Sequence, residues 1–219
     1  MISPIDVEAL GQRLAPLSHG VEALTILRDT LKGLGPVTAR QDFLNERLLC
    51  APITFDVVKD LDPAPELFHV LQGDVIRTDA AYVLGVRRIG RPSFVVATST
   101  CDVVAGRRET AHLLPVEPRR PRDYDDPRKL RDDLANLIAF KTTRYFYLPP
   151  LPDDEPDVLF NVVRLDPFAQ CGNENLAFAE RRASMTVLGW RVFGALLRAI
   201  GVREAAEEVA IRRRGPRPR

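Results

Sequence analysis

The sequence is poor in the residues that build metal centres and disulfide frameworks. Among its 219 residues are only three histidines and three cysteines, Cys50, Cys101 and Cys171. No Cys-x-x-Cys pair or Cys/His cluster gives the spacing of a zinc site. We therefore expect no metal ion and no other cofactor. The odd number of widely spaced cysteines is typical of a reducing, cytoplasmic setting.

The sequence also lacks long apolar runs and an excess of charge of one sign. No uninterrupted apolar stretch approaches the roughly 20 residues needed to cross a bilayer. Residues 1–30 carry charges throughout and have no apolar signal-peptide core. The net charge is only +1, so overall charge gives no reason to expect a nucleic acid or an acidic membrane as partner. We expect a cytoplasmic protein without a membrane partner, in which any charged site is local.

The sequence does contain enough apolar material for a core, since 45% of its residues are hydrophobic and 28% are charged. Residues 1–69 predict a helical layer. Ser3 can cap a first helix, and residues 20–32 predict a second one with its leucines on one face. Thr38 followed by Gln41 resembles a capping box that opens a third helix. Nothing in this layer points to chemistry.

From residue 70 onward, short apolar runs bounded by turn residues are typical of β-strands. The stretch "VLQGDVIRTDAAYVLGVRRIGRPSFVVATSTCD" (70–102) holds two strand candidates joined by a loop with glycine and arginine. Further candidates are "TAHLLPVEP" (110–118), "RYFYLPP" (144–150) and "DVLFNVVRLD" (157–166). These runs predict a β-rich unit over residues 70–203.

Two helices are expected within this unit. Asp126 and Pro127 can start an inserted helix at about 127–140, with its leucines on one side. A long apolar stripe predicts a C-terminal helix over 180–200. Residues 204–219 predict only a short helix and a basic tail, "RRRGPRPR", which either contacts nucleic acid or an acidic partner or is a solubilising end.

The stretch "VVATSTCD" (95–102) predicts a buried strand that ends in a thiol and a carboxylate. If this strand forms a hairpin with the next one, Ser99 lies near His112, and a contact between Cys101 and His112 is possible. An imidazole beside a thiol produces a nucleophilic thiolate, and Asp102 could orient that imidazole. The interpretation that we favour is structural: Cys101 is a small buried hydrophobe, Asp102 caps the loop, and His112 is a core or strand-edge residue.

Two loops carry a local concentration of arginine. If they lie at comparable ends of neighbouring strands, the side chains form one site for a phosphate, a carboxylate or RNA. The alternative is solvated loop charge, partly paired by Asp102 and Glu109. The acidic turn "DDEPD" (153–157) could occupy the chain's own arginine cluster. The arginines of this predicted anion site are Arg87, Arg88, Arg91, Arg107 and Arg108.

Aromatic side chains alternate along the strand candidate at 144–150. One face of Tyr145, Phe146 and Tyr147 could stack nucleic-acid bases. More often such residues fill a core.

The order of the strand segments resembles the PemK/MazF family, small SH3-like barrels that are usually toxins of toxin–antitoxin pairs and cut single-stranded RNA. "QGDVIR" resembles the first strand of that family, "RPSFVVATS" the next and "TAHLLPV" the one after. "DVLFNVVRLDPFA" and the apolar stripe after residue 180 resemble the last strand and the terminal helix. The resemblance covers residues 70–203. It implies an α+β protein, an SH3-like barrel with an N-terminal helical layer and a packed C-terminal helix, and a possible homodimer.

The resemblance places the family's catalytic arginine on Arg91. Its polar catalytic residue, typically threonine, falls on Glu117, whose negative charge would repel an RNA phosphate. We therefore expect a non-catalytic binding or adaptor module of a toxin–antitoxin or antiviral defence-type system. A protein partner is expected, and RNA or DNA is possible.

Two alternatives assign an enzymatic activity. The first is a metal-independent endoribonuclease that uses Arg91 for transition-state charge, with Asp102, Ser99 or His112 in place of the missing hydroxyl. The second, weaker one is a hydrolase or transferase that depends on Cys101.

Overall fold

A computed structural model of the chain describes residues 10, 13, 21–53, 70–104, 107–142 and 144–201. The helices in this part are α2 (Val21–Gly33), α3 (Val37–Arg47), α5 (Pro127–Ile138), α6 (Asn173–Leu176) and α7 (Val187–Gly201). The strands are β1 (Leu49–Cys50), β2 (Val75–Arg77), β3 (Tyr82–Val83), β4 (Val86–Arg87), β5 (Ser93–Val96), β6 (Thr110–Arg119), β7 (Tyr145–Leu148), β8 (Phe160–Arg164), β9 (Ala169–Gly172) and β10 (Glu180–Met185).

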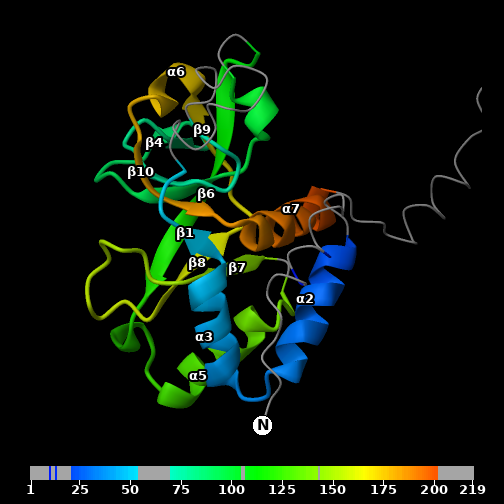
Figure 1. Ribbon diagram of the computed structural model, residues 1–219. Helices are drawn as coiled ribbons and strands as arrows, with labels where there is room; N and C mark the ends of the chain where they lie inside the picture. Colours follow the sequence, from blue (N-terminus) through cyan, green and yellow to red (C-terminus); the bar gives the residue numbers. More distant parts are fainter. Residues whose placement is uncertain are drawn as a thin grey trace, which may run out of the picture.

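The α+β class is confirmed. All strand pairs among the described residues are antiparallel, in the order β1-β10-β2-β5-β6-β9-β3-β4, with β8 beside β6 and β7 beside β8. The path has free ends at β1 and β4, so the sheet is open and a closed SH3-like barrel is not confirmed. Figure 1 shows α2, α3 and α5 together at one end of the molecule, most strands at the other, and α7 between them.

Strand β6 belongs to both halves of the sheet. Its first residues pair with β5 and β9, and its last residues pair with β8. The consecutive residues Leu113 and Leu114 are both buried, but they face different apolar clusters. Leu113 joins a small core among the strands, and Leu114 joins the larger core that the helices cover. Because successive side chains of a strand point to opposite faces, one strand serves two cores.

The predicted helices at residues 20–32 and 127–140 are confirmed as α2 and α5. Leu24, Leu27 and Leu31 of α2 are buried, as their spacing on one face requires. Helix α5 begins as predicted, because the Asp126 side chain accepts a hydrogen bond from the Arg128 backbone N–H at 2.7 Å. Helix α3 has no capping box, since its N-cap is Pro36 and no side chain caps it.

The predicted helix at 180–200 is wrong in its first part, because Glu180–Met185 is strand β10, between β1 and β2. Its buried polar residues Arg182 and Ser184 have their partners far away in sequence, which helical periodicity cannot reveal. The helix begins only after Thr186, whose hydroxyl accepts a hydrogen bond from the Gly189 N–H at 3.2 Å.

Gly189 fixes how closely α7 approaches the preceding layer. A Cβ atom at this position would lie 2.3 Å from the carbonyl oxygen of Leu48, a backbone atom that cannot turn aside. The missing side chain therefore lets α7 contact the junction of α3 and β1 directly. Helix α7 also packs against α2, which places the N-terminal helices and the C-terminal helix around one core.

Some expectations concern residues outside the described ranges. The first helix at Ser3, the short helix after residue 204 and the basic tail lie there, as does the segment 54–69 before the expected boundary at residue 70. None of the helices in the described ranges combines the length and the hydropathy that a membrane span requires.

Candidate functional site: an arginine cleft and an exposed hairpin

The Cys101–Asp102 pair lies in a single 3-10 turn, Thr100–Asp102, after strand β5. Cys101 is exposed, which differs from the buried thiol that we favoured. The Asp102 carboxylate forms an ion pair with Arg108 at 3.2 Å. The fully enclosed thiol is Cys171, and burial raises its pKa to about 11. Of the two, only Cys101 is accessible to a reagent.

His112 does not join this pair. The predicted hairpin between β5 and β6 is present, but its register differs by about two residues: the carbonyl of His112 accepts from the N–H of Ala97 at 2.9 Å. The imidazole ring is exposed and lies 5.6 Å from the ring of Phe168, on the side of β9. Among the described residues, no hydrogen bond connects His112 with Cys101 or Asp102. A Cys–His nucleophile is therefore not assembled in this structure.

The five arginines of the predicted anion site do not share one concavity. Arg87 pairs with Asp79 at 3.1 Å, Arg91 with Glu180 at 3.2 Å, and Arg108 with Asp102. Arg88 and Arg107 are exposed, and no ion pair holds them within the described ranges. Only Arg91 borders a cleft.

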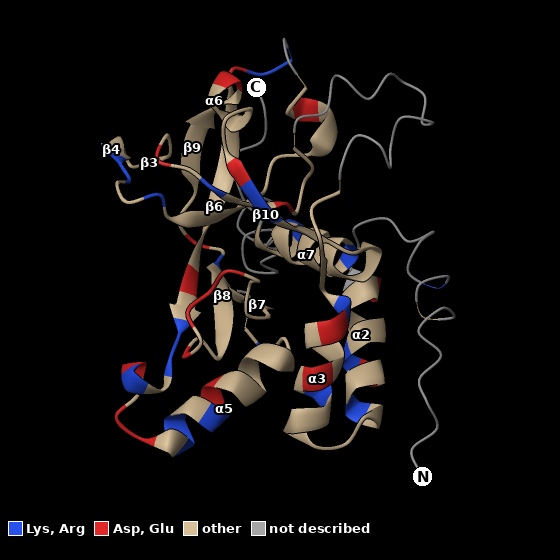
Figure 2. Cartoon of the chain, turned by 60° about the vertical axis from the view of Figure 1, so that its left-hand side comes forward, with Lys and Arg blue, Asp and Glu red and all other residues tan. Residues whose placement is uncertain are grey.

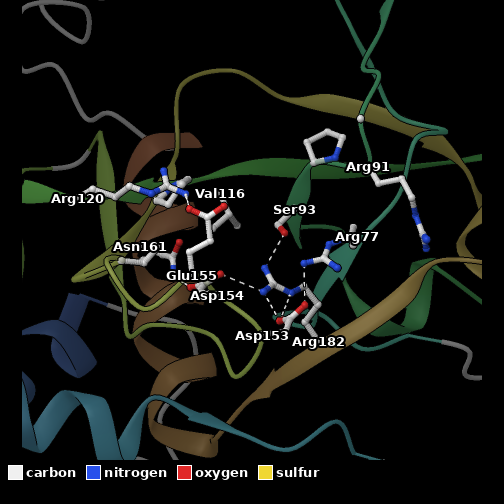
Figure 3. A pocket seen from close by; sticks show the side chains of 14 residues that line it. Arg77, Arg91, Ser93, Val116, Arg120, Asp153, Asp154, Glu155, Asn161 and Arg182 are labelled. Atoms are coloured by element: carbon white, nitrogen blue, oxygen red, sulfur yellow. Dashed lines mark hydrogen bonds and ion pairs between the residues drawn. The ribbon is translucent and has the colours of Figure 1, made fainter. Parts of the chain in front are cut away.

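That cleft has a volume of about 620 Å³. It lies between the end of the β3–β4 hairpin and the acidic loop Leu151–Val158 (Figure 3). Arg77 and Arg182 converge on Asp153 at one end, and Arg120 lies beside Glu155 at the other. Arginines and carboxylates are therefore in close contact along the lining of the cleft.

Arg182 holds the acidic loop against the sheet. Only 4% of its side chain is exposed. Its Nε donates to Asp153 at 2.6 Å, and its terminal nitrogens donate to the Ser93 hydroxyl at 2.9 Å and to Asp154 at 3.0 Å. A buried guanidinium is stable only when its donors are paired, and here three side chains pair them.

The two aspartates of the loop have different roles. Burial opposes ionisation of Asp153, but the hydrogen bond and charge of Arg182 and the charge of Arg77 outweigh it, so the pKa of Asp153 is lowered. Asp154 orders the loop itself, because its second oxygen accepts from the Leu151 N–H at 2.7 Å and from the Asn161 amide at 2.6 Å. The loop therefore begins in a fixed conformation.

At the far end of the loop, Arg120 contacts Glu155 and Asp157, each at 3.3 Å. Arg122 lies within 4 Å of the same two carboxylates. The segment "DDEPD" does therefore occupy a cluster of the chain's own arginines, as we considered, but the arginines are 77, 120, 122 and 182. The sequence carried only one signal for this arrangement, the complementary charge, and it did not identify the partners.

Glu117 lies on β6, where the family resemblance places a catalytic hydroxyl. Its two oxygens lie 3.1 Å from Arg119 and 3.5 Å from Arg164. Neither arginine belongs to the predicted anion site. Glu117 and Arg91 both have ion-pair partners of their own, so the structure does not bring them together as a pair.

The most exposed apolar surface is the β3–β4 hairpin. Its two-residue turn, Leu84–Gly85, has positive φ angles of 50° and 78°, the conformation that closes a tight hairpin. Leu84 is 97% exposed, Val86 66% and Ile89 89%. Strand β4 ends the sheet, so its outer backbone edge has no strand beside it in the described part of the chain.

No known protein family matches the chain, and a comparison with curated proteins finds no significant match. The resemblance to the PemK/MazF family therefore stays a prediction. Among the described residues, no group of three or more His, Cys, Asp or Glu side chains is placed to hold a metal ion.

Proposed function

We propose that this protein is a non-catalytic binding module whose β3–β4 hairpin, residues 82–91, docks onto a protein partner. The resemblance to PemK/MazF suggests the setting, a cytoplasmic toxin–antitoxin or defence-type system built on an SH3-like barrel. The proposal rests on the structure of the hairpin rather than on that resemblance.

The observation that carries the proposal is the exposure of Leu84, Val86 and Ile89. Isolated surface leucines are common, but here three large aliphatic side chains within six residues of one hairpin are all strongly exposed. A rigid turn of this kind can enter a pocket on a partner without first losing much conformational entropy.

The charges around the turn indicate the chemistry of the partner. Arg88 follows strand β4 and has no ion pair within the described ranges, and Arg87 and Arg91 flank it (Figure 2 shows these Lys and Arg positions in blue). Arginine is enriched at the centre and rim of protein interfaces. The complementary surface is an apolar pocket with acidic residues at its edge.

A protein fits this surface better than a nucleic acid does. Binding to RNA relies on arginines that are free to contact phosphates and on aromatic rings that stack on bases. Here Arg87 and Arg91 already have carboxylate partners, and the three most exposed apolar side chains of the hairpin are aliphatic, whereas its one aromatic ring, Tyr82, is only 45% exposed. The strand aromatics Phe146 and Tyr147 are buried in the core and are not available for stacking.

The deciding experiment compares two surface variants of the full chain. Partners captured from the source cells are identified, purified and measured by titration against wild type, Leu84→Asp and Val187→Asp. Val187 is the matched control, because it is 55% exposed at the start of α7, where a carboxylate does not disturb the helix. We expect Leu84→Asp to weaken binding about 30-fold or more, as loss of a central apolar contact does, and Val187→Asp to bind normally.

Equal binding by both variants would contradict the proposal. A parallel, metal-free incubation with single-stranded RNA tests the ribonuclease alternative. Cleavage by wild type that is lost in Arg91→Ala would establish that alternative instead.

The Cys101-dependent alternative has its own test. We expect iodoacetamide to label the exposed Cys101 while the buried Cys171 stays unmodified in the native protein. Because Cys101 lies outside the hairpin 82–91, we expect Cys101→Ser to leave partner affinity unchanged. A loss of function in this variant, with native stability retained, would support the thiol mechanism.

A further inference from the structure

A second, separate cleft lies in the helical layer, far in sequence from the hairpin. Helices α2 and α3 and the chain just after α5 enclose it, and its volume is about 400 Å³. That size is within the range of small-ligand sites. Its lining consists of Arg28, Leu31, Lys32, Arg40, Ala139 and Lys141.

The polar lining of this cleft is entirely basic. Four of its six residues are Lys or Arg, and none is acidic. The one acidic contact is at the periphery, where the exposed Asp29 pairs with Lys32 at 3.1 Å. No ion pair binds Arg28, Arg40 or Lys141 within the described ranges. Like charges gathered in one hollow repel each other, and an anion between them would remove that repulsion.

Arg40 gives the most specific indication of a ligand. Its Nε is enclosed, and no acceptor in the described part of the chain pairs with it. Two other arginines have an enclosed Nε, but Arg181 Nε lies 3.0 Å from Asp74, and the Arg191 guanidinium lies 4.5 Å from the centre of the Trp190 ring. An enclosed guanidinium N–H without an acceptor costs free energy. A ligand oxygen in the cleft would supply the acceptor.

Helix ends of both polarities border the cleft, since the carboxyl ends of α2 and α5 carry negative partial charge and the start of α3 carries positive partial charge. Arg28 donates to the carbonyl oxygen of Phe140, so it already binds the negative end of α5. Helix α3 begins beside the cleft, its first turn holds no acidic residue, and no side chain caps its N–H groups. Arg40 extends from the start of α3 into the lining, and Arg28 offsets part of the negative end of α5.

We propose that this cleft binds a phosphate group, either as inorganic phosphate or as the ester of a small organic molecule. Arg40 is the central ligand, because its planar guanidinium can offer two parallel N–H donors to two phosphate oxygens. Lys32 and Lys141 add charge at the rim. Leu31 and Ala139 form an apolar wall that leaves room for the carbon body of an ester.

Titration calorimetry at low salt tests the site, with inorganic phosphate and ribose 5-phosphate as separate probes. The full-length wild type is compared with Arg40→Gln, Lys141→Gln and Lys129→Gln. Lys129 is the matched control, since it is exposed at the opposite end of α5. We expect the first two variants to weaken binding about tenfold or more, as loss of a charged hydrogen-bond donor does, and the control to bind like wild type.

Each result of the titration has a definite meaning. Stronger binding of ribose 5-phosphate assigns the cleft to an ester, and equal binding assigns it to the phosphate group alone. Failure of both probes to bind below about 10 mM, or equal affinity in all variants, overturns the proposal. Circular dichroism of each variant shows whether it is folded. If Arg40→Gln is not folded, the affinity of Lys141→Gln for the two probes tests the proposal by itself.

Discussion

The arginines that hold the acidic loop and the arginines of the hairpin segment differ in almost every physical respect, and of the second group only Arg91 lines the cleft. The loop-bound arginines, Arg77, Arg120 and Arg182, are largely covered and hold carboxylates from the loop Leu151–Val158. The hairpin arginines, Arg87, Arg88 and Arg91, are exposed and have one carboxylate partner or none within the described ranges. The first group holds the acidic loop against the sheet, whereas in the second group only Arg88 has no ion pair within the described ranges.

The difference shows that the concentration of arginine in a sequence does not indicate where an anion binds. The predicted site was chosen because its arginines are close in sequence, and such loop charges are mostly solvated. The arginines that hold the acidic loop come from β2, from the residue after β6 and from β10, and more than 100 residues separate Arg77 from Arg182. Their ligand is the chain's own acidic loop.

The largest expected effect is the difference in folding stability between variants of the loop-bound arginines and variants of the hairpin arginines. Arg182→Met leaves Asp153 and Asp154 without their covered partner, so we expect the free energy of unfolding to fall by about 3 kcal/mol. Arg87→Met removes a solvated pair and should change it by about 0.5 kcal/mol or less. Urea denaturation of both variants measures the difference. Equal, small effects would show that the loop is not held through Arg182.

A smaller effect of the loop-bound group depends on pH. The pKa of Asp153 is lowered in the folded protein, so its contribution to stability is present above the unfolded pKa of about 3.9 and is lost as pH falls through the folded value. Asp153→Asn cannot make this contribution. Because the side chain is 43% exposed, we expect a difference of about 1 kcal/mol or less after solvent screening.

Denaturation at a series of pH values from 7 to below 3 tests this expectation. Wild type should be more stable than Asp153→Asn at neutral pH, and the two curves should converge as the medium becomes more acidic. A constant difference at all pH values would mean that Asp153 acts by packing rather than by charge.

The smallest expected effect concerns the hairpin group. Arg88→Gln should leave the unfolding free energy unchanged, because no contact of the side chain is lost within the described part of the fold. Affinity for the partner should fall about two- to fivefold, mainly through slower association, and the loss should shrink as salt is added. A stopped-flow measurement at two ionic strengths tests this. A loss that is independent of salt would argue against an acidic partner surface.

The sequence predicted the elements whose signals are local. The leucine spacing gave α2, and Asp126–Pro127 gave the start of α5, because capping and amphipathic burial depend on neighbours within a few residues. It could not predict β10, since Arg182 is buried through contacts with Ser93 and Asp153, 89 and 29 residues away. The sequence also could not predict the strand register at His112. The β5–β6 pairing becomes irregular after Val96, where the N–H groups of Ala97 and Thr98 both approach the carbonyl oxygen of His112.

The same limit applies to the candidate sites. Complementary charge suggested that the "DDEPD" segment meets arginines, but only the folded chain shows which arginines they are. The exposure of Leu84 and Ile89 was not predictable either, because large aliphatic residues are usually buried and the sequence does not show that one lies in the turn and the other after β4. Their projection follows from the position of β4 at the free end of the sheet.

Hydrogen–deuterium exchange of the partner complex tests most directly the claim that the hairpin, and not the cleft, is the docking site. We predict that protection on binding is concentrated in residues 82–91, while the loop 151–158 exchanges as it does in the free protein. Protection of the loop and the cleft, with the hairpin unchanged, would contradict the claim. It would show that the partner binds at the loop-bound arginines.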